Sequence, residues 1–350
     1  MVRSALRRTI LVLASIALCV GVSASVAPAA ALASSTVTVA PADAAAGWLA
    51  RQLTDGDHFE VAFGPDVFPD QGLTIDAVFA FAAARTSGSF AARATTWLAR
   101  PDIMPGYIGD GGTESYAGAT AKLALAAEVR GLSPTNFGGA NLIARLLALQ
   151  APSGQFVDRS AFGDFSNEIG QSLAVLALQR TPAGAPAAAV SFLAGIACAD
   201  GGFPVFFGES PCVSDVDATS FAVQALQAAH RPLAAAAGLR WLVSVQDASG
   251  GFAGAGGVLN ANSTGLAAQA LFGSVHLAAA VKARQFLRTL QVGCAGAVAS
   301  RGAIAFDRTG FDPSTAPRAT AQGVLGLAGV GFSQLSGAGS SGPAPTLFCP

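Results

Sequence analysis

A motif that recurs at nearly constant intervals constrains the fold of this chain more than any other feature. Its most complete copy, in residues 239–252, has the pattern aromatic-Leu-x3-Gln-x3-Gly-x-Phe, carried by Trp241, Leu242, Gln246, Gly250 and Phe252. Full and partial copies start at intervals of 49, 48, 47, 49 and 45 residues, at Trp48, Trp97, Arg145, Phe192, Trp241 and Phe286. This period predicts a repeat architecture, in which each unit buries its apolar face against its neighbours.

An apolar segment follows the motif in each repeat. These segments begin at Ile75, Ala119, Gly170, Ala218, Ser263 and Ala319. They are apolar on nearly every side, which is typical of helices surrounded by other helices, whereas the motif segments mix apolar and polar residues and predict half-exposed helices. We therefore expect six helical hairpins, with the apolar helices as an inner ring and the amphipathic helices outside them. An open solenoid is the alternative, but its end repeats would need polar caps that the sequence does not show.

One position of the apolar segments carries a side chain with an oxygen atom in every repeat. We expect this position to cap the start of each inner helix, because such side chains accept hydrogen bonds from the unpaired amides there. In the shared register it is held by Asp76, Thr120, Gln171, Thr219, Thr264 and Thr320.

Composition and local motifs exclude several classes of function. The formal net charge is −1 and the sequence pI about 6.3, so there is no basic footprint for nucleic acid. The Gly-rich segments near Gly250 and Gly254 lack the Lys of a phosphate-binding loop, and no serine-hydrolase elbow is present. We expect no nucleic-acid partner and no cofactor.

The two ends of the chain predict export. Three arginines precede an apolar run over residues 10–22, and small-x-small sites such as Ala31-Leu32-Ala33 follow it. This order is typical of a secretory signal peptide, which we assign to residues 1–33. The tail, residues 333–350, is rich in Gly, Ser and Pro and has no membrane-anchor pattern. We expect a secreted protein without a membrane anchor.

The cysteines favour disulfides over a metal site. Outside the signal peptide four remain: Cys198, Cys212, Cys294 and Cys349. Four cysteines permit three connectivities in an exported protein, and we favour Cys198–Cys212 because both flank one loop between two helices of the fourth repeat. Cys294–Cys349 would then fasten the tail. A zinc site would need closer ligand pairs with nearby His, so no metal is expected.

The motif resembles the repeat of squalene and oxidosqualene cyclases and of protein prenyltransferase beta subunits. The resemblance covers residues 42–332, with Phe where the cyclases usually carry Trp. It implies an all-α, six-hairpin (α/α)6 toroid with a central cavity. The segments GLTIDAVFAFAAA and SYAGATAKLALAAE are also similar to exported actinobacterial toroid proteins without established function.

Two carboxylates at the start of the fourth apolar segment are the candidate catalytic residues. The stretch CVSDVDAT resembles the D-x-D-D-T motif of proton-initiated terpene cyclases, with Asp215 and Asp217 matching and Ala218 in place of the last Asp. Protonating an alkene requires an unusually strong acid, and the resemblance implies Asp217 as that acid. The stretch also resembles the D-x-C zinc motif of prenyltransferases, but Asp217 replaces the Cys. Alternatively both residues only cap a helix, as Asn167 and Asn260 would do in neighbouring repeats.

A closed ring would gather further polar residues at one rim. Six helix N-termini would meet there and favour anions, above apolar walls. The candidate ligand-binding residues are Asp76, Tyr116, Asn167, Asn260 and Arg318. The loop aromatics are expected to plug one end of the toroid, with substrate stacking as the alternative: Phe162, Phe165, Phe206 and Phe207.

Three functions follow from these features. The favoured hypothesis is a secreted, non-catalytic module that binds a small apolar or anionic ligand or a protein partner. The second is a terpenoid cyclase or prenyltransferase-like enzyme that acts on an isoprenoid through Asp215 and Asp217. The third is a polysaccharide hydrolase or lyase, which would need two carboxylates roughly 5–10 Å apart across the cavity, and Asp76 with Asp215 is the candidate pair.

Overall fold

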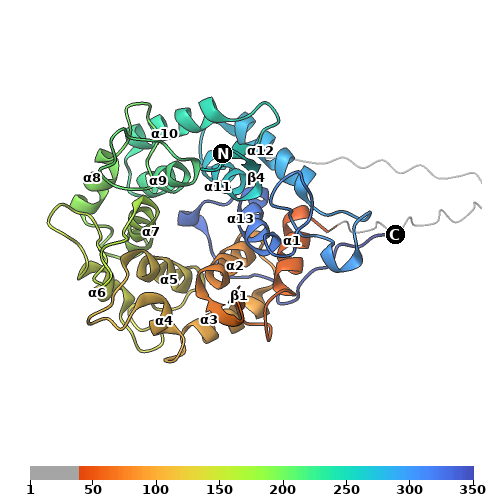
Figure 1. Ribbon diagram of the computed structural model, residues 1–350, viewed down its shortest axis with the longest axis horizontal. Coiled ribbons are helices and arrows are strands. Elements are labelled where there is room, and N and C mark those ends of the chain that lie inside the picture. The colour runs from red at the N-terminus through yellow and green to blue at the C-terminus, as the bar shows by residue number, and fades with distance from the viewer. Residues whose placement is uncertain (1–38) are drawn as a thin grey trace, which may run out of the picture. The chain divides into compact units, whose positions relative to one another are not determined.

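The protein, described by a computed structural model over residues 39–350, is built almost entirely from helices (Figure 1). The signal peptide expected at residues 1–33 lies outside the described residues. The inner helices are α2 (Gln71–Ala84), α5 (Ala117–Val129), α7 (Glu168–Gln179), α9 (Val216–Ala228), α11 (Ala261–Phe272) and α13 (Ala316–Ala328). The outer helices are α1 (Pro41–Ala50), α3 (Gly88–Leu98), α6 (Leu142–Leu147), α8 (Ala187–Gly195), α10 (Pro232–Val245) and α12 (Leu277–Leu290).

Short elements connect the hairpins. Helix α4 (Met104–Ile108) precedes α5, and the 3₁₀ helices are η1 (Val298–Ser300) and η2 (Phe332–Gln334). Two antiparallel hairpins lead into inner helices: β1 (Phe59–Phe63) with β2 (Asp66–Asp70), and β3 (Phe252–Ala253) with β4 (Leu259–Asn260). No helix in residues 39–350 combines the length and the hydropathy that crossing a bilayer requires.

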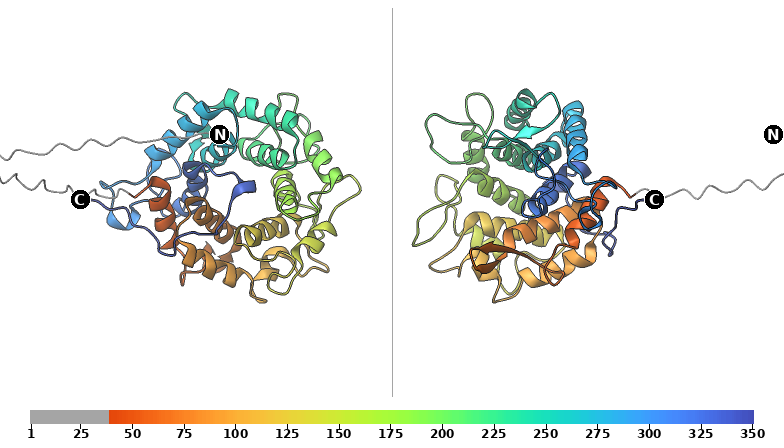
Figure 2. Two further views of the ribbon diagram at one scale, coloured as in Figure 1. Left: turned by 180° about the vertical axis from the view of Figure 1, so that it is seen from behind. Right: turned by 45° about the vertical axis from the view of Figure 1, so that its right-hand side comes forward.

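The six inner helices form a closed ring (Figures 1 and 2). Each contacts the next in chain order, and α13 contacts α2. An outer helix packs on the inner helix that precedes it in the chain, as α3 does on α2 and α12 on α11. Helix α1 has no preceding inner helix and packs on α13 instead, so the two ends of the repeat array cover each other. No repeat is left with an unpaired face that needs a polar cap.

The recurring motif builds one tight turn between an outer and an inner helix. The Gln246 side chain donates to the carbonyl of Gly250 in its own turn and to that of Ala279 in the next outer helix, at 3.0 and 2.9 Å. Gln291 does the same with Gly302 and Pro41, at 3.1 and 2.8 Å, and thereby closes the ring onto α1. In these two repeats the motif amide therefore joins one repeat to the next, and in the third repeat Gln171 of α7 makes the equivalent bonds to Gly154 and Ala189, each at 3.1 Å.

The glycine of the motif is required by close packing. Gly250 has φ +91°, a left-handed conformation that favours glycine. A Cβ atom there would lie 2.4 Å from the carbonyl oxygen of Lys282. The turn can approach the next outer helix only because this residue has no side chain.

The oxygen-bearing side chains of the inner helices do not cap those helices, which corrects the sequence expectation. The hydroxyl of Thr264 accepts the backbone N–H of the motif residue Phe252, at 2.9 Å. Equivalent bonds join Thr74 to Phe59, Gln171 to Phe156, Thr219 to Phe203 and Thr320 to Ile304. In the first repeat Thr74 holds this position rather than Asp76. Asp76 therefore lies two residues farther into its helix than the sequence alignment implied.

The chain that follows α13 closes one end of the ring, and Figure 2 shows this segment inside it. The Phe332 ring lies between Phe79 and Phe221, with centroids 5.4 and 5.3 Å away. The Arg180 guanidinium donates to the carbonyls of Phe332, Ser333 and Leu335, which holds the segment across the opening. The plug is therefore Phe332. The loop aromatics expected in that role are exposed or partly exposed, with Phe162 and Phe165 exposed to 81% and 67%.

Two disulfides restrain the loops. Cys198 is joined to Cys212 and Cys294 to Cys349, with Cα atoms 5.6 and 5.5 Å apart. These are the two pairings expected from the sequence. The second ties the end of the tail to the chain after α12, so the segment that carries Phe332 is anchored on both sides.

Candidate functional site

A cavity of about 430 Å³ opens at the end of the ring where the inner helices begin. Two layers of positions, four residues apart on each inner helix, lie on the same helical face. In the layer nearer the mouth Gly118, Ile169, Asp217 and Arg318 line the cavity, whereas Gly72 and Asn262 hold the same register outside its lining. The deeper layer, all of which lines the cavity, consists of Asp76, Lys122, Leu173, Phe221, Leu266 and Gln322.

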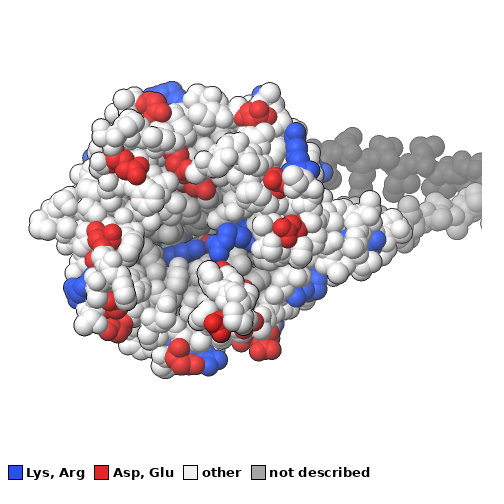
Figure 3. All heavy atoms as spheres, in the orientation of Figure 1, with Lys and Arg blue, Asp and Glu red and all other residues white. Residues whose placement is uncertain are grey.

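The deeper layer divides the cavity into two unlike halves. Helices α13, α2 and α5 contribute Gln322, Asp76 and Lys122, whereas α7, α9 and α11 contribute only apolar side chains. Because these helices are consecutive around the ring, one wall is polar and the opposite wall is apolar at this depth, whereas Asn167 and Asp217 line the α7–α9 side nearer the mouth. Figure 3 shows Lys and Arg side chains in the central hollow, with acidic residues distributed around it.

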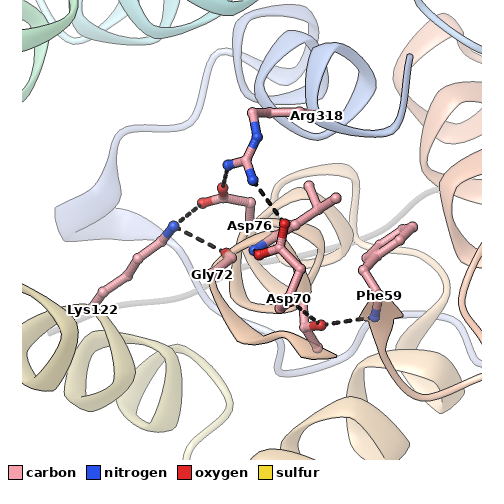
Figure 4. A network of polar contacts seen from close by, with 8 residues as sticks. Phe59, Asp70, Gly72, Asp76, Lys122 and Arg318 are labelled. Carbon is pink, nitrogen blue, oxygen red and sulfur yellow. Dashed lines mark hydrogen bonds and ion pairs between the residues drawn. The ribbon is translucent and has the colours of Figure 1, made fainter. Parts of the chain in front are cut away.

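A network of ion pairs organises the polar wall (Figure 4). Lys122 Nζ lies 2.6 Å from Asp76 Oδ1 and donates to the Gly72 carbonyl at 3.1 Å. Arg318 reaches Asp76 Oδ2 at 3.4 Å and Asp70 Oδ2 at 3.0 Å. Asp70 is also the N-cap of α2, since its Oδ1 accepts the Leu73 amide at 2.7 Å. Three inner helices are thus linked through Asp76.

Two tyrosines stand beside this network. Burial raises the pKa of Tyr107, and the nearby charges of Asp76 and Asp70 raise it further, so its phenol stays protonated. Tyr116 donates its hydroxyl to Glu114 at 2.9 Å. Both rings line the cavity mouth.

Asp217 is the acidic residue of the apolar wall. Its Oδ1 is buried and has no hydrogen-bond partner among the described residues. The pKa of Asp217 is raised to about 6 as the net result of three effects. Burial raises it most, a hydrogen bond from the Ser263 hydroxyl lowers it, and the charge of Asp215 raises it. Asp76 on the opposite wall has two cationic partners, whereas Asp217 forms no ion pair with residues 39–350.

Asp215 caps α9 and lies outside the set of residues that line the cavity. Its Oδ1 accepts the amides of Asp217 and Ala218, each at 2.9 Å. Asn167 and Asn260 cap α7 and α11 in the same way, with bonds of 3.0 and 2.9 Å. Asp215, Asn167 and Asn260 are therefore helix caps, and of the three only Asn167 also lines the cavity. Because Asp215 is outside the lining, the pair Asp76 with Asp215 does not face across the cavity.

Glu168, next to the Asn167 cap, is a further acid that sequence reasoning missed. Its side chain is fully buried, one carboxylate oxygen accepts the Ser172 hydroxyl, and the other has no partner in the described structure. Burial raises its pKa well above the ordinary value, and nearby Asp215 adds to the shift. Glu168 is set behind the cavity wall rather than in its lining.

Most of the candidate residues meet in this cavity. Asp76, Tyr116, Asn167, Asp217 and Arg318 line it, together with residues that the sequence analysis did not select: Lys122, Tyr107, Asp158, Phe221 and Gln322. Lys122 carried a detectable signal, because it is the single charge in the otherwise apolar segment ATAKLALAA. Within residues 39–350 no group of three His, Cys, Asp or Glu side chains could hold a metal ion.

Comparison with known proteins supports the fold and leaves the activity open. No family model and no curated protein matches the chain. Among solved structures, the type II terpene cyclase MstE from Scytonema aligns over 82% of this chain and 96% of its own, with TM-score 0.61 and 14% identity. An unsaturated glucuronyl hydrolase specific for heparin aligns over 83% and 95%, with TM-score 0.57 and 12% identity.

The fold is the α/α toroid. The six-hairpin (α/α)6 prediction is therefore confirmed for the residues described. The chain spans half the length of ent-copalyl diphosphate synthase from Streptomyces platensis, to which it aligns over 73% of its own length with TM-score 0.48 and 16% identity. At these identities the comparisons show the toroid and nothing finer.

Proposed function

We propose that this toroid is an exported binding protein that holds a small organic ligand in its one-mouthed cavity without transforming it. The observation that carries the proposal is a cavity of about 430 Å³ with one polar and one apolar wall. That volume falls within the range of roughly 300–1,000 Å³ that is typical of small-molecule sites. The predicted signal peptide supports export, and so do the two disulfides, which are typical of oxidising compartments.

The closed far end supports a container rather than a channel. The Phe332 plug and the tail cover the end of the ring opposite the mouth. Leu173, Phe221 and Leu266 supply an apolar wall of low exposure. A ligand would enter and leave through the same mouth.

The surroundings of Asp217 do not make it the strong acid that proton-initiated cyclisation requires. Such an acid must be strong, so its ionised form needs stabilising partners. Asp217 has instead a raised pKa of about 6 and no cationic partner within residues 39–350, and Ala218 replaces the last carboxylate of the motif. Asp217 is a weak acid, which favours binding over alkene protonation.

Native mass spectrometry of the protein purified from its own host, before and after mild organic extraction, tests the proposal. We expect an additional mass that extraction removes. The variant Ala119→Phe places a ring in the cavity, which Ala119 lines, and should lose this mass. The control Ala278→Phe adds the same ring to an exposed position of α12 and should keep it. Equal occupancy of both variants, or a protein that is bare from the start and binds no small organic ligand afterwards, would contradict the proposal.

General acid–base catalysis at Asp217 is the second candidate function. A cavity carboxylate whose pKa lies near neutrality suits proton transfer to or from a substrate. Returning the extracted compound to the emptied protein distinguishes the two functions. Recovery of an unchanged compound after many hours supports binding, whereas a product that Asp217→Asn fails to form supports catalysis.

A further inference from the structure

The two walls of the cavity offer opposite kinds of hydrogen-bonding group. On the α2–α5–α13 side the ion pairs leave donors free. Lys122 uses two of its three N–H groups, on Asp76 and Gly72, and Arg318 uses two of its five. The Arg318 side chain is 45% exposed at the mouth. This side can therefore still bind an acceptor, and it does so best for an anion.

On the α7–α9–α11 side the unsatisfied group is an acceptor. Asp217 Oδ1 is buried at the cavity wall and accepts nothing from the described residues. The Asn262 Oδ1 atom, at the same register in the next inner helix but outside the cavity lining, is also buried without a partner among residues 39–350. Buried polar atoms in proteins are rarely unpaired, so each such atom calls for a partner. A donor is needed here, and beside a carboxylate a cationic donor is favoured.

The side chain below Asp217 suits a cation as well. Phe221 lies four residues after Asp217, so both are on the cavity face of α9. One face of the Phe221 ring stacks on Phe332 at an interplanar angle of 16°. The ring also lines the cavity. A carboxylate next to an aromatic ring is a favourable surrounding for an ammonium group.

We propose that the ligand of this cavity is a small amphoteric molecule, whose ammonium group lies between Asp217 and Phe221 and whose anionic group meets Lys122 and Arg318. The apolar part of the molecule contacts Leu173 and Leu266. This inference rests on the proposed binding function and specifies the chemical class of the ligand. It also accounts for the unlike partners of the two acids: Asp76 orients the cations, whereas Asp217 is left for the ligand.

Four probes that share a phenyl ring test the charge pattern. They are phenylalanine, 2-phenylethylammonium, 3-phenylpropionate and the neutral 3-phenylpropanol, each titrated into the extracted full-length mature protein by calorimetry. We expect phenylalanine to bind at least tenfold more tightly than either singly charged probe, and the alcohol to bind most weakly. A neutral probe that binds as tightly as the zwitterion, or binding by none of the four, would overturn the inference.

Two variants of one helix supply the matched comparison. Asp217→Asn should weaken binding of phenylalanine and 2-phenylethylammonium at least tenfold and leave 3-phenylpropionate unchanged. Asp215→Asn, two residues away, keeps a helix cap of the type seen at Asn167 and Asn260 and removes only a neighbouring charge, so it should change each affinity by much less than tenfold. Equal losses in the two variants would refute a direct contact with Asp217.

The natural compound separates this inference from the binding function itself. The material extracted from the native protein should react with an amine-selective reagent and gain the corresponding mass. An extractable compound without an amine would overturn the inference and leave the binding function intact. A protein without any extractable compound, which also binds none of the probes, would contradict both.

Discussion

Asp215 and Asp217 are two residues apart but have different roles, because one is the N-cap of α9 and the other is in its first turn. Asp215 is the cap, so backbone amides satisfy its carboxylate. Asp217 is in the first turn, where its side chain faces the cavity wall and finds no such donors. The sequence resemblance selected both residues. Only the geometry separates the structural one from the one available to a ligand.

The pH dependence of stability should report the burial of Asp217. Its pKa rises from 3.8 to about 6 on folding, so the fold favours the protonated form. The stability associated with that proton is present below pH 4 and is lost as the pH rises through 6. Asp217→Asn should therefore stabilise the protein by on the order of 2 kcal/mol at pH 8 and by much less at pH 4.

Urea unfolding of both proteins across pH 4–8 measures this difference. Glu128, whose pKa burial raises to about 7, also titrates in this window, and the difference between the two proteins removes its contribution. Parallel pH profiles for wild type and variant would contradict the role assigned to Asp217.

At the scale of the element, the unit of this fold is the motif turn together with the helix that follows it. The Gln amide joins one repeat to the next, the Gly permits close approach, and the threonine hydroxyl receives the N–H of the motif Phe. Each role admits few residue types, since Gln171 replaces the threonine in one repeat and Ile304 the Phe in another, which explains why the pattern is visible in the sequence. The loops between motif and helix vary in length and carry no such requirement.

Two glycines near the same turn should differ in their tolerance of alanine. Gly250 and Gly257 both have positive φ, +91° and +73°, so each substitution adds backbone strain of about 1 kcal/mol. A Cβ atom at Gly250 would also collide with the Lys282 carbonyl, whereas one at Gly257 meets nothing within 4 Å. Gly250→Ala should therefore cost on the order of 2 kcal/mol more than Gly257→Ala in chemical denaturation. Similar losses would mean that α12 can shift to accommodate the methyl group.

The hairpins and the disulfide pairs could be predicted from spacing and residue type, and the closed toroid was implied by the resemblance of the motif to a known repeat. The sequence did not predict the register of the first inner helix. Asp76 was aligned with Thr120 because both side chains carry oxygen, and the hydrogen bond from Phe59 that identifies Thr74 is a tertiary contact. With that register known, Asp76 falls into the same layer as Lys122. The cavity lining therefore depended on a two-residue shift that no local pattern reveals.

At the scale of the whole molecule, the tail is part of the container. Phe332 is 1% exposed and is anchored by Arg180 on one side and by Gln224, whose side chain accepts its amide at 3.0 Å. Residues 333–350 are rich in Gly, Ser and Pro, which predicts a tail outside the repeats. Composition cannot show that the residue immediately before the tail fills the centre of the ring.

Removal of the Phe332 side chain should lower the stability of the fold. Phe332→Ala deletes a ring packed against Phe79 and Phe221, and should cost about 3–5 kcal/mol in urea unfolding. Phe348→Ala removes a ring that is 64% exposed and serves as the control, with a change below about 0.5 kcal/mol. If both variants unfold at the same urea concentration as the wild type, the Phe332 side chain does not contribute to the stability of the core.

The packing of α1 on α13 has a consequence for how this architecture can vary. An open array of repeats can gain or lose a unit at its end, because the new unit only replaces one exposed face with another. Here the first outer helix occupies the place that follows the last inner helix, and Gln291 bonds to Pro41 across the junction. The number of repeats is therefore set by circumference rather than by chain length. A chain of five or seven such units would need a different curvature at every junction, so diversity in this fold should arise within the two cavity layers and not by duplication of a repeat.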